Sequence, residues 1–213
     1  MRKVFEIGGL AAAAVLIAFG IGAVVLGVNG RTTVADSLKA EQIVGSPDMT
    51  PAAIAVEAKK AGLPAGIALP TVNVANKTID TGAKARAFAS YMRIHALEAS
   101  GGLTYSQMGR FAIADSSKGT NDPAAAQKGP DGQPLANSAR NLWVTETALA
   151  TALNTSYMAE QTALFGIVVG IALLLSGVGF AILAIGGALR NPEHALNFGK
   201  RTPKVAGTPV PAA

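Results

Sequence analysis

Two stretches decide the fold of this chain: IGGLAAAAVLIAFGIGAVVLGV at residues 7–28 and ALFGIVVGIALLLSGVGFAILAIGGAL at residues 163–189. Neither stretch contains Asp, Glu, Lys, Arg or His. At about 1.5 Å per helical residue, each is longer than the roughly 30 Å hydrocarbon core of a bilayer. The sequence therefore predicts two transmembrane helices. Because neither carries a buried charge, it argues against a transporter with intramembrane ion sites or proton relays.

The first stretch has an alternative interpretation as a cleaved signal peptide. Arg2 and Lys3 would form its positive region, and Val28-Asn29-Gly30 is a tolerable cleavage site. However, the apolar run is longer than the usual core of about 7–15 residues and lacks an A-x-A end. These features favour a retained membrane anchor.

The charges beside the two stretches predict the orientation. Basic residues precede the first stretch and follow the second, namely Arg2, Lys3, Arg190, Lys200, Arg201 and Lys204. The positive-inside rule then places residues 1–6 and 190–213 in the cytoplasm, and the Pro/Ala-rich tail is expected to be disordered. Residues 29–162, with 12 Lys/Arg against 11 Asp/Glu, form an extracytoplasmic domain in this prediction.

The composition supports a membrane protein and excludes several kinds of chemistry. Half of the 213 residues are hydrophobic, but only 5% are aromatic. The absence of cysteine excludes disulfides, thiolate nucleophiles and Cys-ligated metals. The net charge of +5 is not gathered into a basic run with interleaved aromatic residues, so no nucleic-acid partner is expected.

Small residues recur at four-residue spacing within both stretches, which allows helix backbones to approach closely in lipid. The candidates for helix packing are Ala18 with Gly22, Ala23 with Gly27, Gly166 with Gly170, Ala172 with Ser176, and Gly177 with Ala181. They could join the two helices of one chain or helices of different chains. The expected partners are therefore the lipid bilayer and either further copies of this chain or another membrane protein.

The central domain is predicted to be mainly α-helical. Thr50-Pro51 and Gly62 bound one helix, with Ile54 and Ala58 on its inner face. Thr81 begins a second helix that runs to about Ala99, where the apolar spacing places Phe88, Met92, His95 and Ala99 on one face. Residues 114–134 are polar and rich in Gly and Pro, which predicts a flexible loop.

A long helix is expected from about Ser138 through Leu189, continuous with the second transmembrane stretch, because no Gly or Pro interrupts it before Gly166. Its first half would form a stalk, and residues 31–43 would form a second one. Candidate interface residues on the stalk are Trp143, Glu146, Leu149, Leu153 and Tyr157. Large apolar residues are sparse in this domain, so its core should be thin and a partner surface could stabilise it.

The central domain offers little that indicates catalysis. His95 is its only histidine, and it lies in the middle of the predicted apolar face, which favours a buried structural role. The acidic residues are scattered singly, and there is no nucleophile elbow or nucleotide-binding loop. We therefore expect no enzyme activity, no cofactor and no metal site.

Several segments resemble a group of uncharacterised two-helix membrane proteins from actinobacteria. These segments are MRKVFEIGG, VGSPDMTPAAI, YMRIHALEASGG and NLWVTETALATALN before GIVVGIALLL, so that the likeness covers most of the chain except the polar loop and the tail. Members of this group are often labelled aromatic ring-opening dioxygenases of the LigA type. That label implies an iron site and an aromatic pocket.

Three functions remain open at this point. The leading hypothesis is a non-enzymatic structural or accessory interaction subunit of the cell envelope. The alternative is an extracytoplasmic ligand sensor that signals through a separate cytoplasmic partner, since a domain between two membrane helices is the layout of many chemoreceptors. An enzyme is the third.

Overall fold

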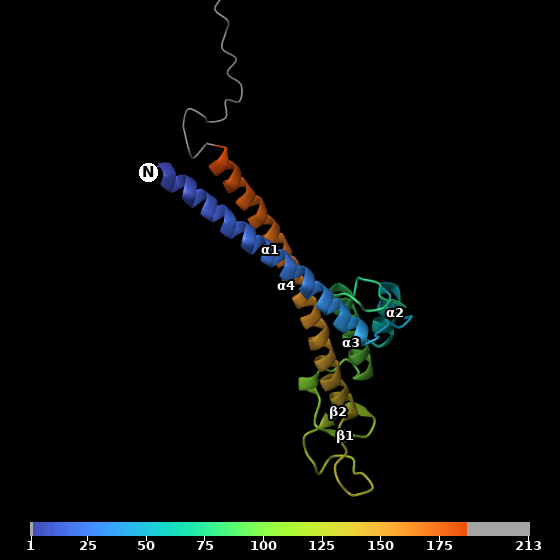
Figure 1. Cartoon of the computed structure of the whole chain (residues 1–213). Helices are drawn as coiled ribbons and strands as arrows, with labels where there is room; N and C mark the ends of the chain where they lie inside the picture. Colours follow the sequence, from blue (N-terminus) through green and yellow to red (C-terminus); the bar gives the residue numbers. More distant parts are fainter. Residues whose placement is uncertain (1, 187–213) are drawn as a thin grey trace, which may run out of the picture. The chain divides into compact units, whose positions relative to one another are not determined.

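The computed structural model describes residues 2–186 and is mainly helical, as the sequence predicted. The elements, in order, are α1 (Arg2–Ala40), α2 (Pro51–Lys60), α3 (Gly82–Ala99), the short 3-10 helix η1 (Tyr105–Gln107), β1 (Phe111–Ile113), β2 (Ser116–Thr120) and α4 (Ser138–Ile185). Figure 1 shows them in chain order. The predicted tail at 190–213 and the last residues of the second apolar stretch lie outside the described residues.

The described chain forms two compact units. The paired-helix unit consists of residues 2–24 and 168–186, and the central unit is Val25–Ile167. Helices α1 and α4 contribute residues to both.

Helices α1 and α4 are long and apolar enough to cross a membrane. They have 39 and 48 residues, or about 58 and 72 Å at about 1.5 Å per residue. Only 17% of the most apolar 18-residue window of each helix is buried, so large side chains such as Phe19, Leu26 and Phe165 point outward. The core helix of a water-soluble protein would instead have most of this surface covered.

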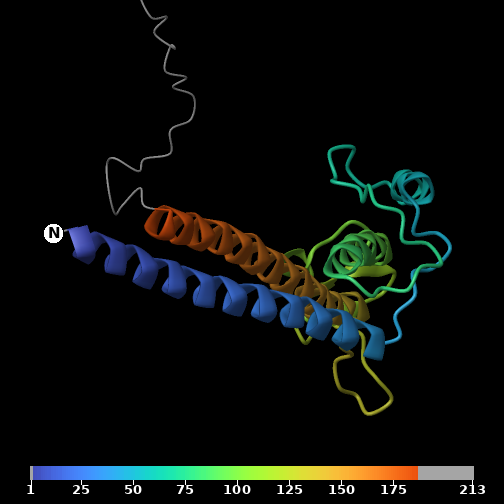
Figure 2. The same cartoon turned by 45° about the horizontal axis from the view of Figure 1, so that its top comes forward.

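In the paired-helix unit, α1 and α4 lie side by side (Figures 1 and 2). Their contact is made by glycine and alanine. The smallest residues on the contact face recur every seven residues: Ala13 and Gly20 in α1, and Gly170, Gly177 and Ala184 in α4. A Cβ atom at Gly20 would lie 2.8 Å from Leu174 Cγ and 2.9 Å from the Gly170 carbonyl oxygen. Side chains are therefore excluded where the backbones meet.

This seven-residue spacing differs from the four-residue spacing that we predicted. Gly170 and Gly177 lie at the contact, and Gly27 lies at a similar contact in the central unit, where a Cβ would be 2.6 Å from the Ala163 carbonyl oxygen. Ala18, Gly22, Ala172 and Ser176 are exposed, while Ala23, Gly166 and Ala181 are half-buried. A seven-residue repeat keeps small residues on one face of two helices that coil around each other, which a four-residue repeat does not do over several turns.

In the central unit, two helices begin where the sequence predicted. Thr50 caps α2, with its hydroxyl accepting a hydrogen bond from the Ala53 amide at 3.1 Å, and Thr81 caps α3 through the Lys84 amide at 3.3 Å. Gly62 follows α2 with a φ of +69°, a conformation in which a side chain would be strained.

The buried face of α3 is not the face that we predicted. Tyr91 and Ile94 lie in the core, whereas Phe88 and Met92 are half-buried and Ala99 is exposed. The Tyr91 hydroxyl donates to the Val72 carbonyl at 3.0 Å, and burial raises the pKa of its phenol. The segment before α3, which contains Val72, packs on the Tyr91 side of the helix. The periodicity of α3 alone cannot show which other segment packs on it.

The polar segment at 114–134 was predicted to be a flexible loop, but the structure places a β-hairpin at its start. Strands β1 and β2 pair antiparallel, with Phe111 opposite Thr120. The side-chain amide of Asn137 donates from Nδ2 to the carbonyls of Gly109 and Ser117 at 3.1 and 2.9 Å. These bonds tie the hairpin to the start of α4. The hairpin could not be predicted from this contact, because the bonded residues are 20 and 28 residues apart in the sequence.

Candidate functional site

An apolar groove opens in the central unit between the end of α1, α3 and α4, with a volume of about 610 Å³. Its lining residues are mostly aliphatic or aromatic: Ser37, Leu38, Glu41, Ile43, Phe88, Met92, Leu149, Ala152, Leu153 and Ser156. Sites for small molecules usually enclose about 300–1,000 Å³ and have mainly apolar walls with a few polar groups. The groove therefore has the size and the chemistry of a ligand site.

The groove accounts for the part of the apolar face of α3 that the core leaves uncovered. Phe88 and Met92 stand one turn apart on that face and form one wall. Leu149 and Leu153, which we predicted to be interface residues, form the opposite wall from α4. The apolar periodicity of α3 thus correctly indicated an apolar face. We expected that face to lie in the core, but Phe88 and Met92 are only half-buried.

The polar groups of the groove are few and carry only negative charge. Glu41 is the acidic residue, and Ser37 and Ser156 supply hydroxyl groups. Among the described residues that line the groove, none is Lys, Arg or His. An occupant with an anionic group beside Glu41 would be repelled, whereas a neutral or cationic group would be accepted.

A cluster of polar contacts connects α1, α3 and α4 in the same unit. The Glu160 carboxylate accepts a hydrogen bond from the Ala83 amide at 3.3 Å, in the first turn of α3, and lies 3.7 Å from the Arg31 guanidinium. A carboxylate is favourable at the positive end of a helix dipole. Gly82 is required there, because a Cβ would lie 2.7 Å from the Tyr157 Cα. These contacts hold the start of α3 against α1 and α4.

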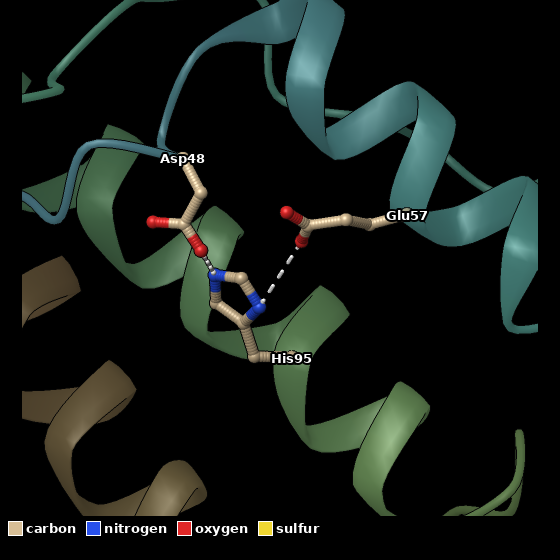
Figure 3. A group of neighbouring side chains, drawn as sticks. All are labelled: Asp48, Glu57 and His95. Carbon is tan, nitrogen blue, oxygen red and sulfur yellow. Dashed lines mark ion pairs between the residues drawn. The ribbon is translucent and has the colours of Figure 1, made fainter.

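A second cluster surrounds His95, which we predicted to be a buried structural residue. Its side chain is instead 30% exposed and lies between carboxylates. Asp48 approaches Nε2 and Glu57 approaches Nδ1, each at 3.6 Å, as Figure 3 shows. The sequence suggested that the acidic residues are scattered singly, and this is wrong here, because the turn before α2 brings residues from distant segments together.

The remaining predicted interface residues have separate positions. Trp143 is 3% exposed and donates from Nε1 to the Leu103 carbonyl at 2.8 Å, so it belongs to the core of the central unit. Glu146 is also buried and lines a smaller polar pocket that includes Arg93. Tyr157 is half-buried, with the Arg86 guanidinium 4.7 Å from its ring centroid. These three residues are not brought into the groove.

The residues around His95 do not fit the iron site that the dioxygenase label implies. Oxygen-activating iron in such sites is held by two histidines and one carboxylate with open positions. The cluster supplies one imidazole and several carboxylates, and the groove has one aromatic residue, Phe88. We therefore derive no ring-opening chemistry from it.

Comparisons with models of protein families, with curated proteins and with solved structures found no match to this chain. What the structure defines is a class: a mainly helical protein with two helices that are long and apolar enough to cross a membrane.

Proposed function

We propose that this chain is an integral membrane protein whose central domain binds a lipid with a single apolar chain and a neutral or cationic head group. The observation that carries the proposal is the apolar groove of about 610 Å³. In this proposal the protein is an accessory or sensing subunit of the cell envelope and not an enzyme. The groove favours the sensor alternative of the sequence over a purely structural role.

The position of the groove along the helices supports a lipid occupant. The apolar segment of α4 begins at Ala163. Ser156 lies seven residues before it, or about 10 Å along the helix. Ser37 follows Val28 by nine residues, or about 14 Å along α1. A chain-bearing molecule that leaves the bilayer surface would thus meet the groove within a short distance.

The proposed orientation places both termini in the cytoplasm and residues 29–162 outside. The positive flanks support it, and the packing of Gly20 against Gly170 supports an α1 that is retained and not cleaved. The chain has no cysteine, so single introduced cysteines report the topology directly. In intact cells, a membrane-impermeant maleimide should label Ser116→Cys and leave Thr202→Cys unlabelled. The opposite pattern would invert the orientation.

The groove is tested by photo-crosslinking in native membranes with a diazirine-bearing monoacylglycerol. We expect the adducts to map to the peptides that contain Phe88–Met92 and Leu149–Ser156. Ala152→Trp, which fills the groove from an exposed position on α4, should reduce the adduct at least about tenfold. The matched control is Val144→Trp, at another exposed position of α4 that lines none of the cavities described above, and it should leave the adduct unchanged.

The head-group preference provides an independent arm of the same experiment. A fatty acid probe with the same chain should label the groove less than the monoacylglycerol, and Glu41→Gln should remove that difference. Adducts that spread evenly along α4, or that survive Ala152→Trp, would refute the lipid proposal. A disulfide between two copies of a Leu149→Cys variant under mild oxidation would refute it as well and would show that the groove is a protein interface.

A further inference from the structure

The cluster around His95 is built from segments that are distant in the sequence. Asp48 lies in the turn before α2, Glu57 lies on α2, and His95 lies on α3 (Figure 3). One ligand atom from each of the three lies within 4.8 Å of the others. Glu98, one turn after His95, adds a third carboxylate at 3.9 Å from Nδ1.

The charge of this cluster is not balanced by basic residues. In the part of the chain that the structure describes, no side-chain nitrogen of Lys or Arg lies within 4 Å of a carboxylate oxygen of Asp48, Glu57 or Glu98. With a neutral imidazole, three negative charges therefore surround one half-buried ring. Elsewhere in the domain carboxylates do have cations, as Asp80 has Lys84 and Glu160 has Arg31. A bound cation would supply the missing positive charge.

The separations suit a metal ion better than direct hydrogen bonds. The distances of 3.6 Å from each ring nitrogen to its carboxylate exceed the usual 2.7–3.2 Å of an N–H···O bond. Two ligands of a tetrahedral zinc ion, each about 2.0–2.2 Å from the metal, lie roughly 3.3–3.5 Å apart. Small side-chain movements would therefore bring the ligands to a shared ion.

The two ring nitrogens have different surroundings, which assigns their roles. Nδ1 faces two carboxylates, Glu57 and Glu98, whereas Nε2 faces Asp48. Metal-bound histidines almost always donate their other ring N–H to a carboxylate or carbonyl, which fixes the ring orientation. Glu98 is placed for this role, because it lies 3.9 Å from Nδ1 and one turn after His95 on α3. Asp48, whose other oxygen accepts from the Ser46 hydroxyl, is then a ligand.

We infer that Asp48, Glu57 and His95 bind a divalent transition-metal ion, with Glu98 orienting the imidazole from Nδ1. An imidazole together with carboxylates suits Zn²⁺, whereas Mg²⁺ and Ca²⁺ prefer oxygen ligands alone. The ion would tie α2 to α3 next to the wall of the groove, since His95 follows Met92 by one turn. This inference does not depend on the lipid proposal, because the ion needs none of the groove residues.

The test is calorimetric titration of the detergent-solubilised full-length protein, stripped with a chelator, with Zn²⁺ and in parallel with Mg²⁺. We expect one Zn²⁺ per chain and no measurable Mg²⁺ binding. His95→Ala should weaken Zn²⁺ binding by more than about 100-fold, since loss of an outer partner alone costs about 10–100-fold. Glu98→Gln should fall in that smaller range, and Asp48→Asn and Glu57→Gln should resemble His95→Ala.

The matched controls change the same residue types elsewhere in the chain. His194→Ala removes the other histidine, and Asp36→Asn removes an exposed acid of α1; both should bind Zn²⁺ as the unchanged protein does. Zn²⁺ should also raise the melting temperature of the unchanged protein and of both controls but not of His95→Ala. Circular dichroism shows whether each variant is folded, and Glu57→Gln gives a second variant if His95→Ala is not. No Zn²⁺ binding by the unchanged protein, or equal binding by a folded His95 or Glu57 variant, would overturn the inference.

Discussion

The two units of this molecule hold their helices together in opposite ways. In the paired-helix unit, α1 and α4 meet where side chains are missing, at Gly20 and Gly170. In the central unit, α3 is held by large buried side chains, of which Tyr91 is completely buried and Trp143 nearly so. The difference follows from the surroundings that we propose for each unit. Burial of apolar side chains drives packing in water, whereas in lipid close backbone contact has to replace it.

The comparison also shows why a groove opens where it does. The large core side chains of the central unit lie on one face of α3, and the small-residue contact of α1 and α4 extends to Gly30 and Ala163. Beyond that contact, Leu38 and Leu153 are buried but Leu149 and Ala152 are exposed. The groove is thus the space that neither kind of packing fills.

Trp143→Ala should have the largest effect on the central unit. The substitution removes a buried ring and the hydrogen bond from Nε1 to the Leu103 carbonyl, and it should lower the free energy of unfolding by about 3–5 kcal/mol. Chemical denaturation followed by circular dichroism measures the change. Val144→Ala, at the neighbouring exposed position, should change it by less than about 0.5 kcal/mol. Equal effects of the two substitutions would mean that this core does not depend on Trp143.

Gly170→Val tests the opposite kind of packing and should have a smaller effect. A Cβ at Gly170 would lie 2.8 Å from both the Gly20 carbonyl oxygen and Val24 Cγ2, so the helices must separate, at a cost of about 1–3 kcal/mol. Thermal unfolding in detergent measures the loss. Gly22→Val is the control, because no atom lies within 4 Å of a Cβ at that position. If Gly22→Val were the more harmful of the two, the four-residue spacing would be the important one.

The smallest expected effect comes from Asp80, at the start of α3. A hydrogen bond from the Lys84 side chain, 2.6 Å away, holds the pKa of the Asp80 carboxyl below its usual value. A carboxyl whose pKa is lower in the folded state contributes stability above its unfolded pKa near 3.8 and loses it as the pH falls through the folded pKa. Exposed ion pairs contribute about 0–1 kcal/mol, so the loss should be small.

The Asp80 contribution is measured as the difference in melting temperature between the unchanged protein and Asp80→Asn. The unchanged protein should be slightly more stable at pH 6, and the difference should shrink as the pH falls below 3.8. A difference that stays constant over this fall in pH would show that the carboxylate charge is not its cause.

Much of the helical framework could be predicted from the sequence because its signals are local. Three features depend only on residues within a turn or two of each other. They are the apolar stretches, the threonine caps at Thr50 and Thr81, and the start of α4 at Ser138. The candidate sites could not be predicted to the same extent. Phe88 and Met92 were recognised as an apolar face, but whether that face meets a core or a groove depends on segments far along the chain.

The sequence by itself determined where α2, α3 and α4 begin and that two helices are apolar enough to cross a membrane, because backbone hydrogen bonds and caps act over a few residues. Only the tertiary structure decided which small residues touch and how wide the groove is. It alone also placed Asp48 and Glu57 around His95. Distances between segments that are dozens of residues apart depend on how whole elements pack, and no short pattern of residues contains that information.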